Sequence, residues 1–470
     1  MDQLFVAPTF SAAAAMASAV DAGLYADAGT KVLMTTSTSP IPELGGGLAE
    51  QPGFAELARR FDRVVSLNEV IYPQHPCSWS PAEDVERWHG ILAAAVGLRE
   101  PFGITLQSLA AKPATSVLRV FPEGPVDVVP DGLTGYGPLP VPAPRQIAPR
   151  LRRLLHLDLA GGLDPVLLRE HVVANVVLSS AGYRDVVAEH GEATASASPG
   201  EERVDAIVLG QDLSTSGLLS PEEEQELHER FLRVAAGLGH RQVVLTPRPS
   251  APPAFAHRLP DLADELGVRL RVLDDPVPAE VLYDRLWPAA VIGCFSAELS
   301  TAAEVYGTAG YAVGVDEVLE RLPKLQDGNR VPLAITDVRL NRADVAPDGT
   351  LVERGPVEID LQLLVDEIAH AMRRPGAVSE DRRRLLAEHP WTAKFFAGAD
   401  DVAGRAAVVP VPQAGAPGDD QRHADARAVA RKVRTRLRRD AGRLVRQAAR
   451  RSGAVRRAKA VAQAVMFRPH

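Results

Sequence analysis

The sequence has only two cysteines in 470 residues, Cys77 and Cys294. Two thiols cannot build a disulfide framework, so we expect the chain to fold in a reducing cytosol. The histidines are scattered and no CxxC or HExxH spacing occurs, which excludes the common metal-binding motifs. A GxGxxG loop and a P-loop are also missing, so the sequence carries no nucleoside triphosphate fingerprint.

The first 30 residues contain no Lys or Arg, so we expect no secretory signal there. No run of 18 apolar residues occurs, and we therefore expect no membrane-spanning segment. The overall hydrophobic content of 46% is nevertheless enough for large cores. A chain of this length predicts two domains and an appendage rather than one core.

Charge is divided unevenly along the chain. Residues 421–470 carry 16 Lys and Arg against 2 Asp and Glu, whereas the other 420 residues carry 36 against 58. A basic tail on an acidic body indicates that the two parts meet different partners.

Short apolar runs alternate with amphipathic helical stretches, which is typical of parallel sheets with crossover helices. This order predicts an α/β fold with two Rossmann-like halves. In the first half we expect strands at 4–7, 32–35, 64–67, 103–106, 117–121 and 126–129. In the second half we expect them at 206–209, 243–245, 270–273, 290–292 and 312–315.

A helix is expected after Ser220, because Pro221 suits the first helical position and Glu223 completes a capping box. Two more are expected near 360–373 and 379–388. The pattern divides the chain into a first domain (1–190), a second domain (205–345), a helical extension packing on them (357–400), a linker (408–420) and a basic amphipathic helical tail (421–470).

The first candidate site follows the strand expected at 126–129, which ends in Pro130, Asp131 and Gly132. Asp131 would lie at the carboxyl edge of the sheet, where ligands bind in open α/β folds, and Gly132 would let the backbone turn with positive φ. A carboxylate there can act as general base on a sugar hydroxyl. An ordinary Asp-Gly turn is the alternative.

A proline-rich loop at 246–253 carries the second candidate site. Its rigid turn would hold Arg248, Pro249 and Ser250 at the same kind of edge, where a guanidinium and a hydroxyl suit a phosphate. An arginine that simply extends into solvent is the alternative.

Two further strand ends carry candidate ligands. Ser296 precedes a helix and is expected to cap it, and the same geometry presents backbone N–H groups to a phosphate. Gln211 follows the strand at 206–209 and would hydrogen-bond a nucleotide base or phosphate. Capping serines and loop glutamines also occur without ligands, so both interpretations stay open.

Residues 424–466 place apolar side chains, from Val429 to Ala448, at three- to four-residue spacing with arginines between them. This pattern predicts a basic amphipathic helix that binds an anionic membrane surface. Such helices also bind the phosphate backbone of nucleic acids, and a plain solvated helix is a third interpretation. The acidic body argues against nucleic acid as the main partner.

Together these segments resemble the bacterial α-2,8-polysialyltransferase family, in its actinobacterial form, from about residue 3 to residue 345. The resemblance rests on the stretches at 61–69, 75–81, 131–133, 154–159, 209–211, 247–253, 293–296 and 329–332. It implies a GT-B-like fold, with two Rossmann-like domains facing each other across a cleft. It also implies inverting transfer of sialic acid from CMP-sialic acid, without a metal or other cofactor.

The resemblance makes Asp131 the general base and Ser296 a phosphate ligand. The sequence departs from the family pattern at Pro130, which replaces the first of two acidic residues, and at Arg248, which replaces a histidine. Ala297 leaves Ser296 without a second adjacent hydroxyl. Arginine neutralises a phosphate but does not donate a proton. Because CMP leaves as a stable anion, charge compensation is compatible with turnover.

The sequence therefore predicts a cytoplasmic glycosyltransferase at the inner membrane face. Its first domain would bind a surface glycan, such as a capsule polysaccharide, or a lipid-linked precursor. Its second domain would bind the CMP-sugar. Three alternatives stay open: a transferase for another donor such as a CDP-polyol, a catalytically silent glycan- or nucleotide-binding homologue, and a nucleic-acid-binding protein acting through its tail.

Overall fold

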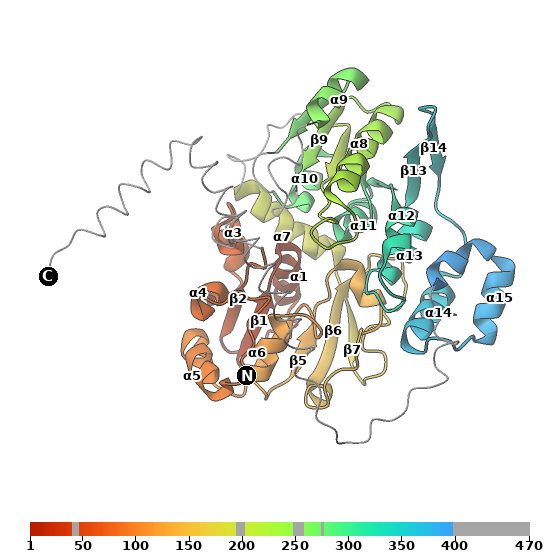
Figure 1. Ribbon diagram of the computed structural model, residues 1–470. Helices are drawn as coiled ribbons and strands as arrows, with labels where there is room; N and C mark the ends of the chain where they lie inside the picture. Colours follow the sequence, from red (N-terminus) through yellow and green to blue (C-terminus); the bar gives the residue numbers. More distant parts are fainter. Residues whose placement is uncertain (40–46, 194–202, 248–257, 274–276, 398–470) are drawn as a thin grey trace, which may run out of the picture. The chain divides into compact units, whose positions relative to one another are not determined.

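A computed structural model gives the fold of the chain (Figure 1). It describes residues 1–39, 47–193, 203–247, 258–273 and 277–397. Residues 1–407 form one compact unit, in which the described residues build two seven-stranded sheets with helices. The linker expected at 408–420 and the basic tail at 421–470 lie outside the described residues.

The first sheet has the strand order β3-β2-β1-β4-β5-β6-β7, and all of its strand pairs are parallel. Its strands are β1 (Gln3–Ala7), β2 (Lys31–Thr35), β3 (Arg63–Ser66), β4 (Gly103–Leu106), β5 (Val126–Val128), β6 (Leu151–Leu157) and β7 (Ala174–Leu178). Its helices are α1 (Phe10–Asp21), η1 (Leu48–Glu50), α3 (Phe54–Ala58), α4 (Leu67–Ile71), α5 (Val85–Val96), α6 (Ala114–Val120), η2 (Gly132–Tyr136), η3 (Ala148–Arg150) and α7 (Ser180–Ala193). We call this part the first lobe.

The second sheet has the order β10-β9-β8-β11-β12-β13-β14, parallel except for the β13–β14 hairpin. Its strands are β8 (Ala206–Leu209), β9 (Gln242–Thr246), β10 (Arg269–Val272), β11 (Ala290–Gly293), β12 (Ala309–Ala312), β13 (Asn341–Val345) and β14 (Leu351–Arg354). Its helices are α8 (Pro221–Gly237), α9 (Leu259–Leu266), α10 (Ala279–Leu286), α11 (Ala297–Glu304), α12 (Val315–Arg321) and α13 (Arg330–Arg339). We call this part the second lobe.

Both sheets are doubly wound, which confirms the α/β fold with two Rossmann-like halves. The strand order reverses between β1 and β4 in the first sheet and between β8 and β11 in the second. In open parallel sheets, ligands bind outside the carboxyl ends of the strands at such a reversal. The boundary that we place between 190 and 205 stays a prediction, because residues 194–202 lie outside the described ones.

Two of the expected strands differ from the structure. Residues 117–121 do not form a strand, because residues 114–120 form α6, which Pro113 precedes. A short buried apolar run fits a helix as well as a strand, and here the helix packs on the core with Val117 and Leu118. The last expected strand lies earlier, at β12, because Gly314 adopts φ +76° and Val315 begins α12.

Four strands of the structure, β6, β7, β13 and β14, are not predicted from the sequence patterns. In β6, Arg152 and Arg153 interrupt the apolar run, because both bind the buried Asp127 on β5 at 2.6 Å. Burial alone would raise the pKa of Asp127, but the hydrogen bonds from the two arginines outweigh it and hold that pKa below its ordinary value. Strands β13 and β14 mix polar and apolar residues and are largely exposed or half-exposed, so they lack the buried-strand pattern. Strand β7 is mostly apolar but mostly exposed, and it is not recognised as a strand.

Helix α8 begins as expected. The Ser220 hydroxyl accepts a hydrogen bond from the Glu223 N–H at 3.1 Å, and the Glu223 carboxylate accepts one from the Ser220 N–H at 2.7 Å. The two helices expected near 360–373 and 379–388 are α14 (Leu361–Arg373) and α15 (Glu380–Glu388), followed by η5 (Pro390–Phe396).

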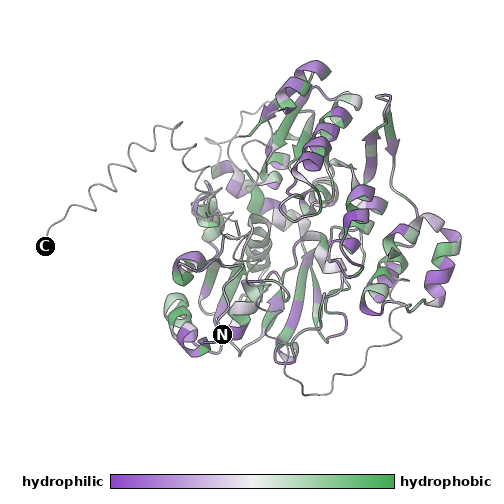
Figure 2. Ribbon diagram, viewed as in Figure 1, coloured by the Kyte–Doolittle hydropathy of each residue, from purple (hydrophilic) through white to green (hydrophobic). Residues whose placement is uncertain are grey.

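The two lobes share one hydrophobic core. A single buried cluster includes Phe5 and Leu155 of the first sheet together with Val208 and Ile292 of the second. Figure 2 shows hydrophobic residues concentrated on the strands and on the inner faces of the helices. Helix α7 contributes to both sides, since it packs on α1 and α3 in the first lobe and on α10 in the second. The lobes are therefore held together by buried apolar surface as well as by polar contacts.

Helix α14 also spans the two lobes. It packs on α13 of the second lobe, and its Gln362 Oε1 accepts a hydrogen bond from the Asp164 N–H of the first at 2.9 Å. Arg169 and Asp366 pair across the same contact at 2.6 Å. The helical extension therefore packs on both lobes.

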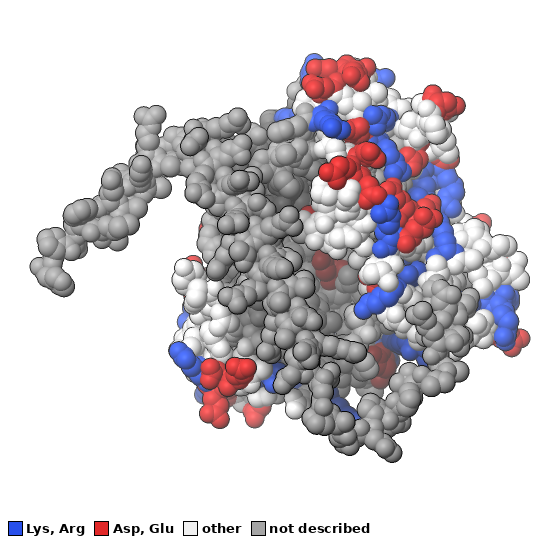
Figure 3. All heavy atoms as spheres, viewed as in Figure 1, with Lys and Arg blue, Asp and Glu red and all other residues white. Residues whose placement is uncertain are grey.

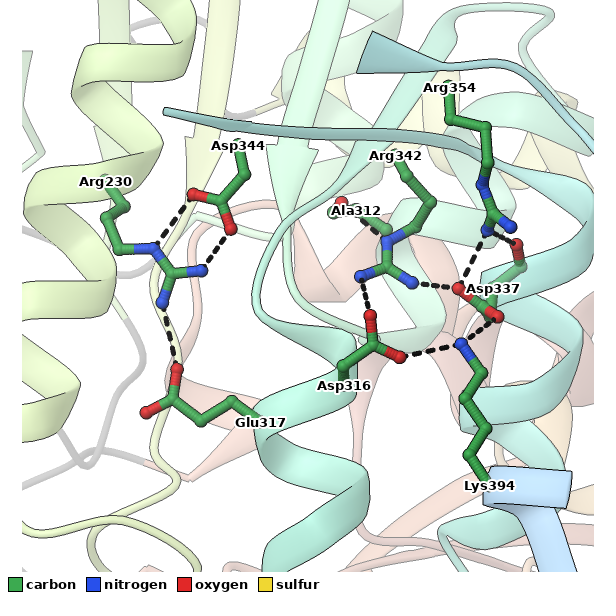
Figure 4. Close-up of polar contacts among 9 residues, drawn as sticks. All are labelled: Arg230, Ala312, Asp316, Glu317, Asp337, Arg342, Asp344, Arg354 and Lys394. Carbon is green, nitrogen blue, oxygen red and sulfur yellow. Dashed lines mark hydrogen bonds and ion pairs between the residues drawn. The ribbon is translucent and has the colours of Figure 1, made fainter. Parts of the chain in front are cut away.

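Charged side chains of both signs intermingle on the surface of the second lobe (Figure 3). One group of them extends into the interior, where Asp337 on α13 has no exposed surface. Figure 4 shows three cations around it: Arg342 on β13, Arg354 on β14 at 2.9 Å and Lys394 on η5 at 2.7 Å. Asp337 thereby joins the hairpin to the end of the helical extension.

We expect Asp337→Asn to lower the free energy of unfolding by roughly 1 to 3 kcal/mol, because it removes the charge of a buried carboxylate that three partly exposed cations share. Denaturant unfolding measures the change. Asp381→Asn is the matched control: Asp381 pairs with the exposed Arg384 on the surface, and its substitution should cost less than about 1 kcal/mol. Equal losses in the two variants would contradict a stabilising role for this network.

Candidate functional site

A cavity of about 730 Å³ lies between the carboxyl ends of the two sheets. The first lobe lines it with the segments that follow β1, β2, β4, β5 and β6. The second lobe lines it with the segments that follow β8, β9 and β11 and with the start of α13. Both strand reversals therefore open into the same cavity, which is the position that the topology predicts for a ligand.

Asp131 and Gly132 lie where the lobes meet on the cavity wall. Gly132 has φ +46°, and a Cβ atom on it would lie 2.3 Å from the Cβ of Ala297 at the start of α11. Only glycine fits this backbone at this distance. The strand end that carries Asp131 therefore touches the N-terminus of α11 directly.

Ser296 occupies the N-cap position of α11, but its side chain makes no capping hydrogen bond. The residue is 8% exposed, and its Oγ has no hydrogen-bond partner among the residues that the structure describes. Buried hydroxyls are almost always paired, with protein, water or ligand. The position agrees with the sequence, whereas the expected side-chain cap is absent, and the hydroxyl remains available to a ligand in the cavity.

Gln211 lies on a loop that is hydrogen-bonded to two side chains of α8. The Gln211 N–H donates to Nε2 of His228 at 2.9 Å, and Nδ1 of His228 donates to the Glu224 carbonyl at 2.6 Å. The Glu224 carboxylate accepts the N–H of Leu213 at 2.6 Å and bonds the hydroxyl of Ser214. These contacts fix the loop backbone at the cavity wall.

Burial lowers the pKa of His228 to about 4, so its imidazole is neutral at physiological pH. Only the neutral ring can accept the Gln211 N–H at one nitrogen while donating from the other. The charge state of His228 thus decides whether the Gln211 N–H keeps its acceptor, while Glu224 holds Leu213 and Ser214 independently. The sequence patterns miss His228 and Glu224, because their role depends on a contact between α8 and a loop ten or more residues away.

A hydrogen bond joins the two lobes beside the cavity. The Tyr183 hydroxyl on α7 donates to Oε1 of Glu280 on α10 at 3.3 Å, and both residues line the wall. Burial raises the pKa of Tyr183, so the hydroxyl keeps its proton and remains a donor. The sequence patterns do not single out either residue.

The wall is acidic. Asp131, Asp212, Glu280 and Glu298 all line the cavity, whereas none of the described lining residues is Lys or Arg. Thr246 and Pro247, at the end of β9, also form part of the wall. The next three residues, Arg248, Pro249 and Ser250, lie outside the described residues, so their predicted roles stay predictions.

The structure thus brings Asp131, Gly132, Gln211 and Ser296 to one cavity. It adds first-lobe residues that the sequence patterns did not single out as site residues, among them the buried His156 on β6. His156 was noticed only within the resemblance at 154–159, because its strand was not recognised.

Within the described ranges, no group of three or more His, Cys, Asp or Glu side chains is placed to hold a metal ion. None of the helices in that same part of the chain combines the length and the apolar character that a membrane crossing requires.

Two doubly wound lobes around a shared cavity define a two-lobed α/β protein whose strand reversals face one ligand site. A sequence profile of the alpha-2,8-polysialyltransferase family matches residues 3–314. The chain belongs to this family, and it is therefore of the glycosyltransferase class. The match ends before the stretch at 329–332, which we included in the resemblance.

The chain also matches solved structures at low identity and low TM-score. The GT-B domain of a sialyltransferase from Photobacterium damselae is 11% identical, with a TM-score of 0.38, covering 72% of this chain and 96% of that one. A UDP-bound transferase from Siraitia grosvenorii is 11% identical, with a TM-score of 0.38 and coverages of 84% and 99%. The E. coli heptosyltransferase WaaC, with ADP-2-deoxy-2-fluoro heptose, is 11% identical, with a TM-score of 0.31 and coverages of 67% and 88%. No curated protein matches the sequence.

The His228 contacts generate a prediction for pH. Because the pKa of His228 is about 4 in the folded chain and about 6.5 in the unfolded one, the unfolded chain binds more protons between these values. Stability should therefore fall as the pH drops through that window. Between pH 7.5 and 5 we expect His228 to account for a loss of about 2 kcal/mol in the free energy of unfolding.

Denaturant unfolding at the two pH values should show a smaller loss in His228→Gln than in the unsubstituted chain. His370→Gln on α14 is the control and should keep the full loss. An unchanged pH dependence in His228→Gln would contradict the neutral, buried state of this ring.

Proposed function

We propose that the protein is a metal-independent, inverting glycosyltransferase that moves a CMP-activated sialic acid, or a similar acidic sugar, to a glycan acceptor. The observation that carries the proposal is the direct contact between the Asp131–Gly132 strand end and the start of α11. It sets a carboxylate beside a helix N-terminus in one cavity. Family membership supports the reaction class.

The start of α11 suits the phosphate of the donor. Ser296 offers a buried hydroxyl without a described partner, and the first N–H groups of a helix attract anions. Glu298 lies in the same first turn and on the same wall, and its charge opposes an anion there. The phosphate therefore needs an additional cation.

Arg248 is the residue we propose for that cation. It follows Pro247, the last described residue of the wall, directly in the sequence. A guanidinium stays charged at every physiological pH and pairs with phosphate through two donors. We propose that Pro249 and Ser250 complete this loop and that Gln211 binds the nucleotide from the neighbouring loop, which follows β8.

Asp131 is the group we propose as general base. It would take the proton from the acceptor hydroxyl while that oxygen attacks the anomeric carbon and CMP departs from the opposite face. One direct displacement of this kind inverts the anomeric configuration. Gly132 allows the approach of α11 that brings the leaving phosphate within reach of the same acceptor.

Two other functions fit the same cavity. A CDP-polyol donor would present the same cytidine leaving group, and a catalytically silent homologue would bind nucleotide or glycan without transfer. Thermal shifts with CMP-sialic acid, CDP-glycerol and UDP-sugars separate the donors. Stabilisation by UDP-sugars alone would rule out a cytidine nucleotide.

Two substitutions should affect different steps: one should weaken CMP binding, and the other should slow sugar transfer. Ser296→Ala removes a hydrogen bond to phosphate and should weaken CMP binding about tenfold. Asp131→Asn should leave CMP affinity nearly unchanged and lower transfer by about 100- to 10,000-fold, the usual contribution of a positioned base. Calorimetric titration with CMP and product release from CMP-sialic acid measure the two effects.

Ser300→Ala is the matched control for Ser296, because Ser300 lies on the same helix, is buried and does not line the cavity. Its affinity for CMP should match that of the unsubstituted chain. If Asp131→Asn transferred sugar at the rate of the unsubstituted chain, Asp131 would not be the general base.

We also propose that residues 421–470 bind an anionic membrane surface, where a lipid-linked acceptor would be met. The full chain should sediment with vesicles that contain phosphatidylglycerol, less so at high salt, whereas a chain ending at residue 407 should not. The shortened chain should still act on a soluble acceptor. Binding of the full chain to DNA but not to these vesicles would contradict the membrane proposal.

A further inference from the structure

The reaction proposed above leaves one buried imidazole on the cavity wall without a role. His156, on β6, is 5% exposed and lines the cavity. Its Nδ1 lies 3.0 Å from the carbonyl oxygen of Leu157. A carbonyl can only accept, so Nδ1 carries a proton; with that one proton on the ring, Nε2 presents a lone pair.

The Nε2 atom of His156 is buried and has no hydrogen-bond partner among the described residues. His228 differs from His156 in this respect: it is also buried, but both of its ring nitrogens are hydrogen-bonded. Leaving an acceptor buried and unpaired is unfavourable, and a bound water, ion or ligand is one way in which such a group is satisfied. His156 lines the cavity, and its Nε2 can accept a hydrogen bond but makes none with the described residues. A ligand that donates a hydrogen bond would satisfy this atom.

His156 lies on the strand next to the proposed base. Strands β5 and β6 pair in parallel with Val128 opposite Leu154, so Asp131 and His156 both follow this pair toward the carboxyl edge. The ring of Tyr136, at the end of the short helix that Asp131 begins, packs edge-on against His156 with centroids 6.0 Å apart. The carboxylate and the imidazole therefore belong to one corner of the first-lobe wall.

We propose that His156 is an acceptor-binding residue, whose Nε2 accepts a hydrogen bond from a hydroxyl of the incoming glycan. This contact orients the sugar so that a neighbouring hydroxyl meets Asp131. No proton moves to the imidazole, and no bond is made or broken at it. The inference rests on the proposed function and adds the chemical class that this wall recognises, a sugar hydroxyl.

The decisive variants are His156→Phe, which keeps the ring shape but removes the acceptor atom, and His156→Gln, which supplies an amide oxygen. Each is compared with the unsubstituted full-length chain in two assays. One follows hydrolysis of CMP-sialic acid with water as the only acceptor. The other follows transfer to two fluorescent glycosides, a lactoside and an α-2,8-linked oligosialyl lactoside, so that a neutral acceptor and an anionic one are distinguished.

In His156→Phe we expect KM for the glycoside that the enzyme uses to rise about tenfold, the loss of one hydrogen bond. Hydrolysis and the Kd for CMP should stay within about twofold, and His156→Gln should recover part of the KM. His75→Phe is the matched control: it is a half-buried first-lobe histidine whose Nε2 bonds the Ser39 carbonyl, and it does not line the cavity. An unchanged KM, or a parallel fall in hydrolysis, would overturn the role of His156 toward the acceptor.

Titration of the ¹⁵N-histidine-labelled chain with the same glycosides tests the contact without the donor. The Nε2 resonance of His156, assigned by its loss in His156→Phe, should move upon glycan binding, and that of His75 should not. No movement at saturating glycoside would overturn the inference. Failure to bind CMP in the presence of this movement would instead contradict the proposed donor.

Discussion

The close approach of Gly132 to Ala297 is the constraint on which the rest of the site depends. A β-carbon at position 132 would overlap that of Ala297, and a positive φ is required in addition. The contact joins the end of β5 in one lobe to the start of α11 in the other. The proposed base and the proposed phosphate site therefore lie on adjoining pieces of backbone. Their separation is set by main-chain packing, which varies less than long side chains do.

Sequence patterns predict most of the two sheets for a clear reason. Strands buried on both faces, such as β1, β8 and β11, read as short apolar runs, and their carboxyl ends carry the ligands in any doubly wound sheet. That rule alone brings Asp131, Gln211 and Ser296 to one cavity. Strand β6 breaks the rule because Arg152 and Arg153 pair with Asp127 of the neighbouring strand, a contact that no local pattern reveals.

The residues that hold the site are harder to predict than those that line it. His228 and Glu224 lie on a helix whose sequence resembles any amphipathic helix, yet they fix the backbone at Gln211 and Leu213. His156 is not predicted as a site residue, because its strand, β6, is not recognised from the sequence. In each case the signal is the number of hydrogen bonds that a buried side chain makes or lacks, and this number exists only after folding.

The acidic wall determines how an anionic donor can be bound. Four carboxyl residues and no Lys or Arg stand on the described wall, whereas the proposed donor carries a phosphate and a carboxylate. One helix N-terminus contributes about half a positive charge, and Glu298 in its first turn already offsets part of it. The proposed donor therefore calls for a positive charge close to its phosphate. The sequence supplies one in Arg248, directly after the described wall ends at Pro247. A permanently charged arginine in place of the family histidine fits this balance, because a histidine would neutralise the same wall only when protonated.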